Sequence, residues 1–357
     1  MGLRDIPYKT FSWNTHKKKG KLNKLSVCQF ELTFGCHLHC RHCYADCYNK
    51  PPHLKKELSI EEVKIILNKV YRAGAIWLFF TGGDPLTRKD FLKIYSFAQE
   101  KGFIITIFTN GYSMTQGIAE YFKRRPPFVI EITLNAVRED LYEKMSQVKG
   151  SFAKVMRGID LILKEKLPLK IKTQVSRDNL EQLPKIKKFI EGLGLKFRPS
   201  YLLHPRLNGD LAPCNLRISP EEILNFDGKK SLPKDDCGLL PQATANRLED
   251  DLFRCAVKGG GGIHIDPYGN TFVCNLIRKP SFNLLEFKLQ EIRDKLLASV
   301  RKRKFTTVSK CKNCNLRRFC LNCPGKAYLE TTDMEAPVSY YCKLAKETVK
   351  PHSDLTI

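Results

Sequence analysis

Short apolar runs alternate with amphipathic stretches from residue 27 to about residue 203, and this alternation constrains the fold more than any other feature. The runs predict six strands, over 27–32, 75–81, 103–109, 128–134, 169–175 and 196–202. The stretches between them predict helices over 60–72, 89–101, 116–124, 152–164 and 183–193. Repeated strand–helix units form a parallel sheet with helices outside, and six units are too few to close an eight-unit barrel. We therefore predict an α/β fold, an open, partial (β/α)6 barrel.

Three cysteines follow the first predicted strand. Cys36, Cys40 and Cys43 are spaced C-x3-C-x2-C in a polar loop that also contains three histidines. Thiolates are soft ligands of iron–sulfur clusters, and three such cysteines can each bind a different iron of one cubane cluster. The fourth iron then stays open to a cofactor or substrate. A zinc site is the alternative, but the position after a first strand favours the cluster, because chemistry in such folds gathers at the carboxyl ends of the strands.

Seven more cysteines lie near the carboxyl end of the chain: Cys255, Cys274, Cys311, Cys314, Cys320, Cys323 and Cys342. Cysteines at ligand-like spacings favour cluster or metal binding over disulfides. One or two structural zinc sites are the alternative for this set. We interpret Cys28, Cys47, Cys214 and Cys237 as free thiols, with Cys47 and Cys237 as candidate spare ligands.

The cysteine loop resembles the signature of the radical S-adenosylmethionine (SAM) enzymes. Thr81-Gly-Gly-Asp-Pro-Leu86 follows the second predicted strand and resembles the family's GGEP motif, with Asp84 in place of Glu. The resemblance implies a [4Fe–4S] cluster held by the three loop cysteines, with SAM bound at the open iron. It also implies that His42 lies against the adenine. The other implied cofactor-binding residues are Gly82, Gly83, Asp84, Pro85, Asn110, Thr133, Asn135 and Ser176.

The cysteines near the carboxyl end resemble the SPASM domain, a module that carries two auxiliary [4Fe–4S] clusters. The order and spacing match, except that two residues and not three separate Cys320 from Cys323. The resemblance implies that Cys255, Cys274 and Cys323 bind the first auxiliary cluster. It implies that Cys311, Cys314, Cys320 and Cys342 bind the second. The first cluster would keep an open iron or take Cys237 as its fourth ligand.

These patterns divide the chain into five parts. We expect an N-terminal extension over 1–26, a radical SAM core over 27–204 and a connector over 205–250. A SPASM domain over 251–350, with short strands and turns, and a tail over 351–357 follow.

The chain has a formal net charge of +24, which attracts acidic partners and nucleic acid. The basic runs at 17–21 and 301–304 are not interleaved with aromatic residues as a base-stacking surface would be. We therefore favour a solvated, lysine-rich surface and expect no nucleic-acid partner. The apolar runs are too short to span a bilayer and the N-terminus lacks the apolar region of a signal peptide, so we expect a cytoplasmic protein without a membrane partner.

The resemblance implies an enzyme that cleaves SAM reductively to a 5′-deoxyadenosyl radical, which takes a hydrogen atom from the substrate. SPASM enzymes mostly act on peptides and proteins, so we expect ribosomal peptide maturation, such as crosslink formation. Only 35 residues precede Cys36, so we expect a separate leader-peptide-binding protein. A flavodoxin- or ferredoxin-like electron donor is also expected. The alternatives are a tetrapyrrole of the haem pathway or a tRNA as substrate, or a non-catalytic iron–sulfur electron carrier.

Overall fold

A computed structural model of the protein describes residues 7–21, 24–226 and 250–349. Its centre is a nine-stranded sheet in the order β6-β5-β4-β3-β2-β1-β7-β8-β9. Strands β1 to β7 pair in parallel, and β8 and β9 add antiparallel. The strands are β1 (Val27–Thr33), β2 (Trp77–Gly82), β3 (Ile104–Thr109), β4 (Val129–Thr133), β5 (Leu169–Gln174), β6 (Pro199–Ser200), β7 (Gly262–Ile265), β8 (Asn270–Phe272) and β9 (Phe282–Asn283). The predicted α/β fold is confirmed, with a last core strand of only two residues.

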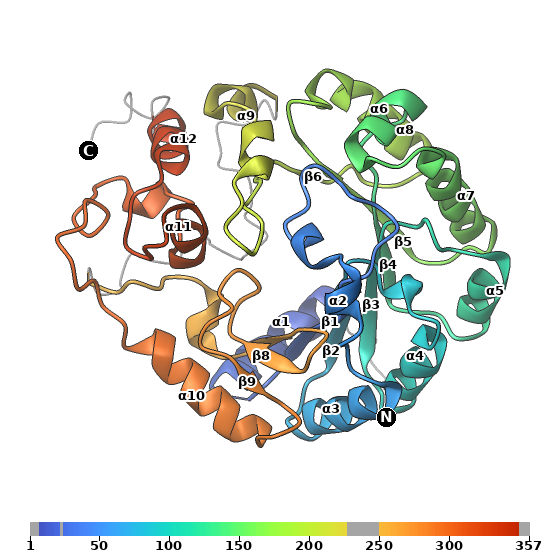
Figure 1. Ribbon diagram of the computed structural model, residues 1–357, viewed down its shortest axis with the longest axis horizontal. Helices are drawn as coiled ribbons and strands as arrows, with labels where there is room; N and C mark the ends of the chain where they lie inside the picture. The colour runs from blue at the N-terminus through green and yellow to red at the C-terminus, as the bar shows by residue number, and fades with distance from the viewer. Residues whose placement is uncertain (1–6, 22–23, 227–249, 350–357) are drawn as a thin grey trace.

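Helices cover the outer side of the curved sheet, while its inner side stays open toward the carboxyl-terminal part (Figure 1). Five of them are those that the sequence predicts: α3 (Ile60–Arg72), α4 (Phe91–Glu100), α5 (Gln116–Arg124), α7 (Ser151–Lys164) and α8 (Leu183–Gly192). Helix α3 begins at a capping box, in which Ser59 and Glu62 bond to each other's backbone N–H groups. Its apolar face buries Val63, Ile66 and Val70 in the core. Burial of this face against the sheet gives the helix most of its stability.

Several helices were not predicted. They are α1 (Tyr8–Lys21), the short α2 (Pro51–Leu54), α6 (Glu139–Ser146), α10 (Leu289–Arg301), α11 (Pro324–Thr331) and α12 (Ser339–Val349). The part after residue 251 has the expected short strands, but also the helices α10, α11 and α12, which were not predicted. Leu289, Ile292, Leu296 and Val300 of α10 are buried at helical spacing, so the signal was present in the sequence. None of the helices in the described parts of the chain combines the length and the apolar character that crossing a bilayer requires.

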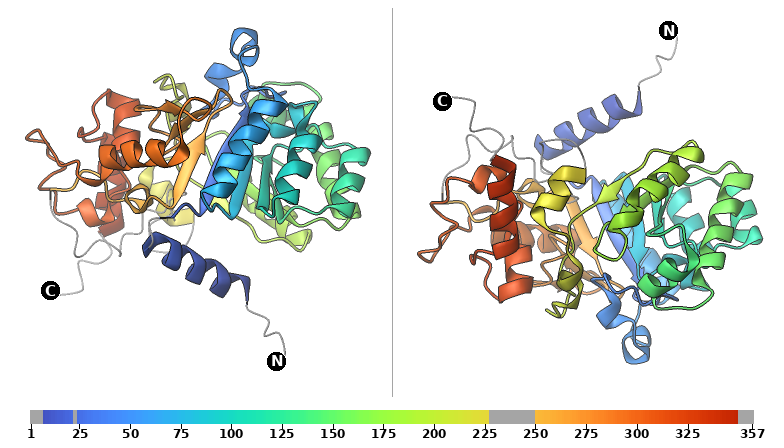
Figure 2. Two further views of the ribbon diagram at one scale, coloured as in Figure 1. Left: turned by 90° about the horizontal axis from the view of Figure 1, so that it is seen from below. Right: turned by 90° about the horizontal axis from the view of Figure 1, so that it is seen from above.

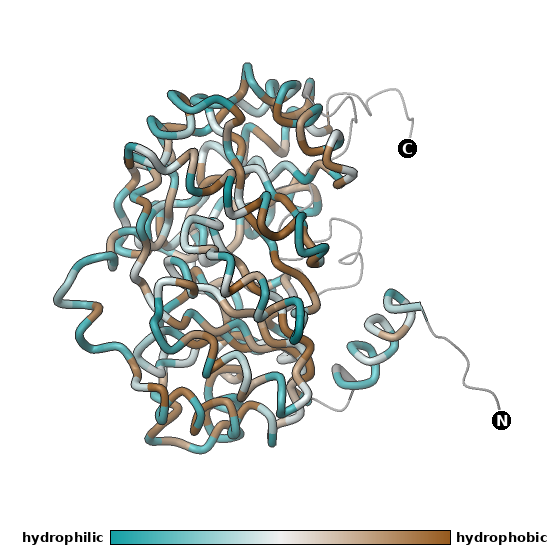
Figure 3. The backbone as a smooth tube through the Cα atoms, turned by 90° about the vertical axis from the view of Figure 1, so that its right-hand side faces the viewer, coloured by the Kyte–Doolittle hydropathy of each residue, from teal (hydrophilic) through white to brown (hydrophobic). Residues whose placement is uncertain are grey.

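Helix α1 packs at the amino ends of the strands. The Tyr8 ring lies 4.6 Å from the Phe128 ring, and its hydroxyl accepts a 2.9 Å hydrogen bond from the Trp77 indole. The helix stands apart from the main layer of helices (Figure 2) and is largely hydrophilic (Figure 3). It therefore covers the end of the barrel opposite the cysteine loop, which follows the carboxyl end of β1.

The carboxyl-terminal part is joined to the barrel through the sheet itself, because β7 pairs in parallel with β1 from Val27↔Gly262 to Phe30↔Ile265. Between the two parts, the described residues of the predicted connector include α9 (Pro220–Phe226), which packs on α12. Residues 227–249 of that connector lie outside the described residues.

Two buried ion pairs hold these parts together. Arg278 donates two 2.8 Å hydrogen bonds to the carboxylate of Glu31 on β1, and its guanidinium lies 4.8 Å from the centre of the Phe272 ring. Arg217 bonds the carboxylate of Glu330 on α11 at 3.0 and 2.7 Å. The side chains of Glu31 and Arg278 are 4% and 17% exposed, so either charge alone would be left in an environment of low dielectric constant.

Replacing Arg278 by Met should therefore lower the free energy of unfolding by about 3–5 kcal/mol, because the Glu31 carboxylate would lose its buried partner. Urea unfolding of the metal-free chain measures this. The double variant Glu31→Gln/Arg278→Met should recover part of the loss. Arg138→Met, which breaks an exposed pair with Asp140, is the control and should leave stability nearly unchanged. If Arg278→Met and Arg138→Met lowered the free energy of unfolding equally, the prediction would be contradicted.

Candidate active site

The cysteine loop is held by hydrogen bonds on both sides. Cys36 donates its N–H to the Asn49 Oδ1 at 3.1 Å, and the Asn49 Nδ2 donates to the Cys36 carbonyl at 3.1 Å. The His39 and Arg41 N–H groups donate to carbonyl oxygens at the end of α6 at 3.0 Å. The three thiols thus lie on a loop whose backbone is fixed before any ligand binds.

The loop thiols sit in a buried, mutually repelling arrangement. Burial raises the pKa of Cys36 to about 12, and the nearby Asp84 and Cys43 charges add to this effect. Burial, Cys43 and Cys36 raise the pKa of Cys40, and burial raises that of Cys43 to about 11. Three thiolates can stand together here only if a cation offsets their charge. The site therefore fits a metal-containing group that supplies positive charge to all three sulfurs.

In the parts of the chain that the structure describes, no three His, Cys, Asp or Glu side chains converge tightly enough to hold a single metal ion. In a [4Fe–4S] cluster, by contrast, each cysteine binds a different iron.

The two glycines after β2 are required by a close approach of backbones. The Gly83 N–H donates to the Thr33 carbonyl at 2.7 Å, and the Asp84 N–H donates to the Gly35 carbonyl at 2.9 Å. A Cβ at Gly83 would lie 2.5 Å from the carbonyl oxygens of Phe34 and Gly35. Gly82 has φ +139°, and a Cβ there would overlap the Thr33 carbonyl. Because these N–H groups are already bonded, the peptide carbonyls remain for a cofactor.

Asp84 connects the end of β2 to the end of β3. Its carboxylate is fully buried and accepts hydrogen bonds from the Thr109 hydroxyl, the Asn110 N–H and the Leu86 N–H at 2.8–3.0 Å. Burial raises the pKa of this carboxyl, while those hydrogen bonds oppose the rise. The Asn110 side chain in turn donates to the Cys36 sulfur at 3.3 Å. Asp84 therefore holds Asn110 beside Cys36. The next residue, Pro85, is also buried.

The ends of β4 and β5 bring the remaining predicted cofactor-binding residues together. The Asn135 Nδ2 lies 3.2 Å from the His42 Nε2, and its Oδ1 accepts from the Gln174 N–H at 2.8 Å. Burial lowers the pKa of His42 to about 4, so this ring is neutral at physiological pH. Its Nδ1 has no hydrogen-bond partner among the described residues. Thr133 is half-buried at the end of β4, and Ser176 is fully buried.

Three residues that shape the site were not predicted. Asn179 accepts the Ser176 N–H at 2.8 Å and donates to the Asn135 carbonyl at 2.8 Å. Arg206 donates to the Cys43 carbonyl at 3.3 Å and pairs with Asp46. Asn49 fixes Cys36, as described above. Each is a single polar residue with no local pattern, so only contacts between distant parts of the chain reveal its role.

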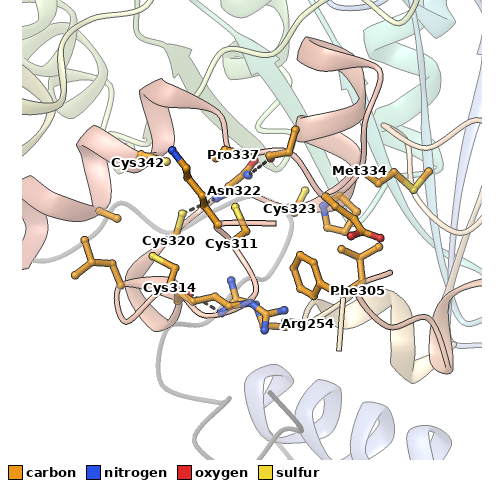
Figure 4. A pocket seen from close by; sticks show the side chains of 18 of the residues that line it. Arg254, Phe305, Cys311, Cys314, Cys320, Asn322, Cys323, Met334, Pro337 and Cys342 are labelled. Atoms are coloured by element: carbon orange, nitrogen blue, oxygen red, sulfur yellow. Dashed lines mark hydrogen bonds between the residues drawn. The ribbon is translucent and has the colours of Figure 1, made fainter. Parts of the chain in front are cut away.

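The carboxyl-terminal cysteines lie in two neighbouring groups. Cys311, Cys314, Cys320, Cys323 and Cys342 line one cavity of about 220 Å³ (Figure 4). Burial raises the pKa of Cys274 to about 12, and the nearby charges of Cys323 and Cys255 add to it, which brings these three together. Cys323 thus stands between the groups.

Two of the cysteines interpreted as free thiols lie in apolar surroundings. Cys28 is buried in the core, and Cys47 packs, together with the loop cysteine Cys43, against a small apolar cluster that contains Phe34 and Leu207. The candidate ligand Cys237 lies outside the described residues.

Residues 30–190 match the family model of the radical SAM superfamily. The chain carries a radical SAM domain. The predicted radical SAM family is thereby confirmed for the barrel, and the family implies a [4Fe–4S] cluster and SAM.

Two kinds of curated relative match this radical SAM enzyme. The AdoMet-dependent heme synthase of Methanosarcina barkeri is 25% identical over 338 residues, which is 87% of this chain and 95% of the relative. The PqqA peptide cyclase of Granulibacter bethesdensis is 26% identical over 167 residues, which is 46% of this chain and 43% of the relative.

Solved structures show the same fold over nearly the whole chain. SuiB of Streptococcus suis bound to the precursor peptide SuiA has a TM-score of 0.67 at 15% identity, covering 94% of this chain and 80% of SuiB. Native anSMEcpe with bound AdoMet and the Cp18Cys peptide has a TM-score of 0.61 at 16% identity, covering 91% of this chain and 96% of the other. The likeness of fold therefore continues past the radical SAM domain into the cysteine-rich part.

Gly83→Ala should destabilise the metal-free chain by about 1–3 kcal/mol, because the new methyl group would press on two carbonyl oxygens. The same variant should lose SAM binding, since the carbonyls of this turn would move. Gly117→Ala is the matched control, because a Cβ at this α5 position meets nothing within 4 Å; it should keep or slightly raise stability. Urea unfolding and equilibrium dialysis with SAM test both variants, and normal SAM binding by Gly83→Ala would contradict the prediction.

Proposed function

We propose that this enzyme uses SAM to remove a hydrogen atom from a peptide or protein substrate, as in the maturation of ribosomal peptides by crosslink formation. One observation carries the SAM chemistry: the cysteine loop, the two-glycine turn and Asn110 lie together at the carboxyl edge of one sheet. The two peptide-bound structures that share the fold over more than nine-tenths of the chain support the substrate class.

Cys36, Cys40 and Cys43 would hold the [4Fe–4S] cluster. Bound there, the cluster and SAM supply one-electron reductive cleavage to a 5′-deoxyadenosyl radical, which needs a potential near the low end of the range of such clusters. The chain's part is to position these groups. The Asn110 amide donates to the Cys36 sulfur, and hydrogen bonds to ligand sulfurs tune cluster potentials.

The remaining predicted residues would orient SAM. Gly82 and Gly83 present carbonyls that accept its amino group. Thr133, Asn135 and Ser176 stand at the ends of β4 and β5, toward the ribose and methionyl parts. His42 is neutral and buried, so it can lie against an adenine without the cost of burying a charge.

Two auxiliary [4Fe–4S] clusters would occupy the cysteine groups near the carboxyl end. Cys255, Cys274 and Cys323 would hold the first, and Cys311, Cys314, Cys320 and Cys342 the second. All four cysteines of the second set line one cavity, which Cys323 of the first set also lines, so the two clusters would be neighbours. Arg254 lies beside cysteines of both sets, so its charge would help to offset that of both clusters.

The other parts of the proposal follow the sequence. The core spans 27–204, the connector 205–250 and the SPASM domain 251–350. A separate leader-binding protein would present the substrate, a flavodoxin- or ferredoxin-like protein would supply electrons, and the enzyme would work in the cytoplasm.

A tetrapyrrole is the second candidate substrate. It is favoured by the match to the AdoMet-dependent heme synthase, which covers 87% of this chain and 95% of that relative. A net charge of +24 would suit the carboxylates of a tetrapyrrole as well as an acidic peptide.

Replacing the loop cysteines Cys36, Cys40 and Cys43 together by Ala should abolish formation of 5′-deoxyadenosine and remove about four irons per chain. Cys214→Ala is the control and should keep both, since this thiol belongs to neither cysteine group. Anaerobic reconstitution, iron analysis and chromatography after addition of SAM and dithionite provide the measurements. 5′-Deoxyadenosine at wild-type levels in the triple variant would refute the assignment.

The two substrate classes are separated by product analysis. Co-expression with a small precursor peptide encoded next to the gene should give a peptide whose mass falls by about two hydrogens per crosslink, because each crosslink removes one hydrogen atom from each partner. Incubation with Fe-coproporphyrin III should leave that tetrapyrrole unchanged. Conversion of the tetrapyrrole together with an unmodified peptide would replace the peptide proposal by the second candidate.

A further inference from the structure

The cavity of the second cysteine group opens on the most basic part of the chain. Residues 301–329 contain no Asp or Glu and nine basic residues: Arg301, Lys302, Arg303, Lys304, Lys310, Lys312, Arg317, Arg318 and Lys326. Of these, Lys326 is buried, and Lys304 and Lys312 pair with Asp251 and Asp250. Arg254, Lys310, Arg317 and Lys346 line the cavity itself. Glu335 is the acidic residue that lines it, and its carboxylate is taken up by the N–H and hydroxyl groups of Thr306 and Thr307 at 2.7–3.1 Å.

Several of these cations face solvent without a carboxylate partner. Lys310, Arg318 and Lys346 are exposed, and none of them forms an ion pair within the described ranges. Arg318 is the neighbour in the chain of Arg317, which lines the cavity, and it lies 4.7 Å from the centre of the Phe319 ring. The cavity lining and Arg318, together called the rim, therefore carry a concentration of positive charge, and such charge steers acidic proteins toward the surface that bears it.

The cysteines of this group also lie close to the surface. Of the cysteines that the structure describes, Cys314 alone is exposed, while Cys311 and Cys342 are half-buried, as the cysteines of the amino-terminal loop also are. A cluster bound here would be separated from solvent by little protein. The basic rim and the shallow sulfurs thus coincide on one face, beside α12 and the loop that follows α10 (Figures 1 and 4).

We propose that this face is the docking surface for an acidic one-electron carrier protein. The inference rests on the proposed second auxiliary cluster. On docking, the reduced carrier loses one electron and the oxidised cluster gains it, and no atom or bond is exchanged. Lys310, Arg318 and Lys346 form the contact that recognises the carrier, and its acidic surface replaces the solvent that now screens them.

The test uses the reconstituted holoenzyme and an acidic flavodoxin as the probe. The variant Lys310→Glu/Arg318→Glu/Lys346→Glu reverses the rim. The matched control, Lys185→Glu/Lys187→Glu/Lys188→Glu, makes the same change of net charge on exposed residues of α8, on the other side of the barrel (Figure 1). Calorimetric titration at low and high salt gives the affinity, and stopped-flow mixing with reduced flavodoxin gives the rate of cluster reduction.

The rim variant should bind flavodoxin at least about tenfold more weakly and lose most of the salt dependence, because the charge contacts that salt screens are gone. The control should change affinity less than about twofold. The rate with flavodoxin, relative to the rate with dithionite, should fall by the same factor in the rim variant. Equal weakening by both variants would reduce the effect to net charge and overturn the proposal.

Other outcomes separate this proposal from the one it rests on. Iron analysis and electron paramagnetic resonance after dithionite reduction report whether the second cluster is present. If the iron of the second cluster is missing but the rim variant still binds flavodoxin more weakly than the unaltered protein, the cluster is refuted and the docking surface is kept. Full clusters with unchanged binding by the rim variant would refute the docking surface alone. Tighter binding of single-stranded RNA than of flavodoxin, lost in the rim variant, would assign this face to nucleic acid instead.

Discussion

Contact between the backbones that follow β1 and β2 positions the whole active site. The N–H groups of Gly83 and Asp84 bond to carbonyls just before Cys36, and no side chain fits between the two segments at either glycine. The cysteine loop and the turn after β2 are therefore one rigid unit. Asp84 extends this unit to β3 by accepting three donors with its buried carboxylate, which sets Asn110 against the Cys36 sulfur. A single close approach thus fixes Cys36, the Asn110 amide that bonds to its sulfur and the peptide groups of the two-glycine turn.

Electrostatics explains why this enzyme needs its metal groups to be in place. Burial and mutual repulsion raise the pKa values of the loop thiols and of Cys274, so these thiols are protonated until iron binds. Iron bound to these sulfurs would release the thiol protons and replace repulsion by attraction. Arg206 near Cys43 and Arg254 near the carboxyl-terminal groups lower part of this cost. Fixed positive charges thus lie beside both cysteine regions.

The sequence predicted those features that have a local cause. The bounds of α3 and α5 were predicted to the residue, because a cap and an amphipathic face mark each of them. The pairing of β7 with β1 left no local signal, since it joins residues more than 230 positions apart. Helices α10, α11 and α12 were missed for another reason: cysteine spacing dominated the interpretation of that part, although the apolar spacing of α10 is plain. Asn179 and Arg206 act through contacts between distant segments, which no motif encodes.

The choice of substrate depends on residues other than those that carry the chemistry of the barrel. Relatives named for haem synthesis and for peptide cyclisation both match this chain, and one fold can serve many reactions. What differs must lie where the barrel opens toward the carboxyl-terminal part. There β7 adds to β1, Arg278 binds Glu31, and Arg217 ties the connector to α11. These contacts fix the cysteine-rich part relative to the barrel. The residues between β6 and α9, which lead from the barrel to that part, are therefore the place to seek substrate specificity.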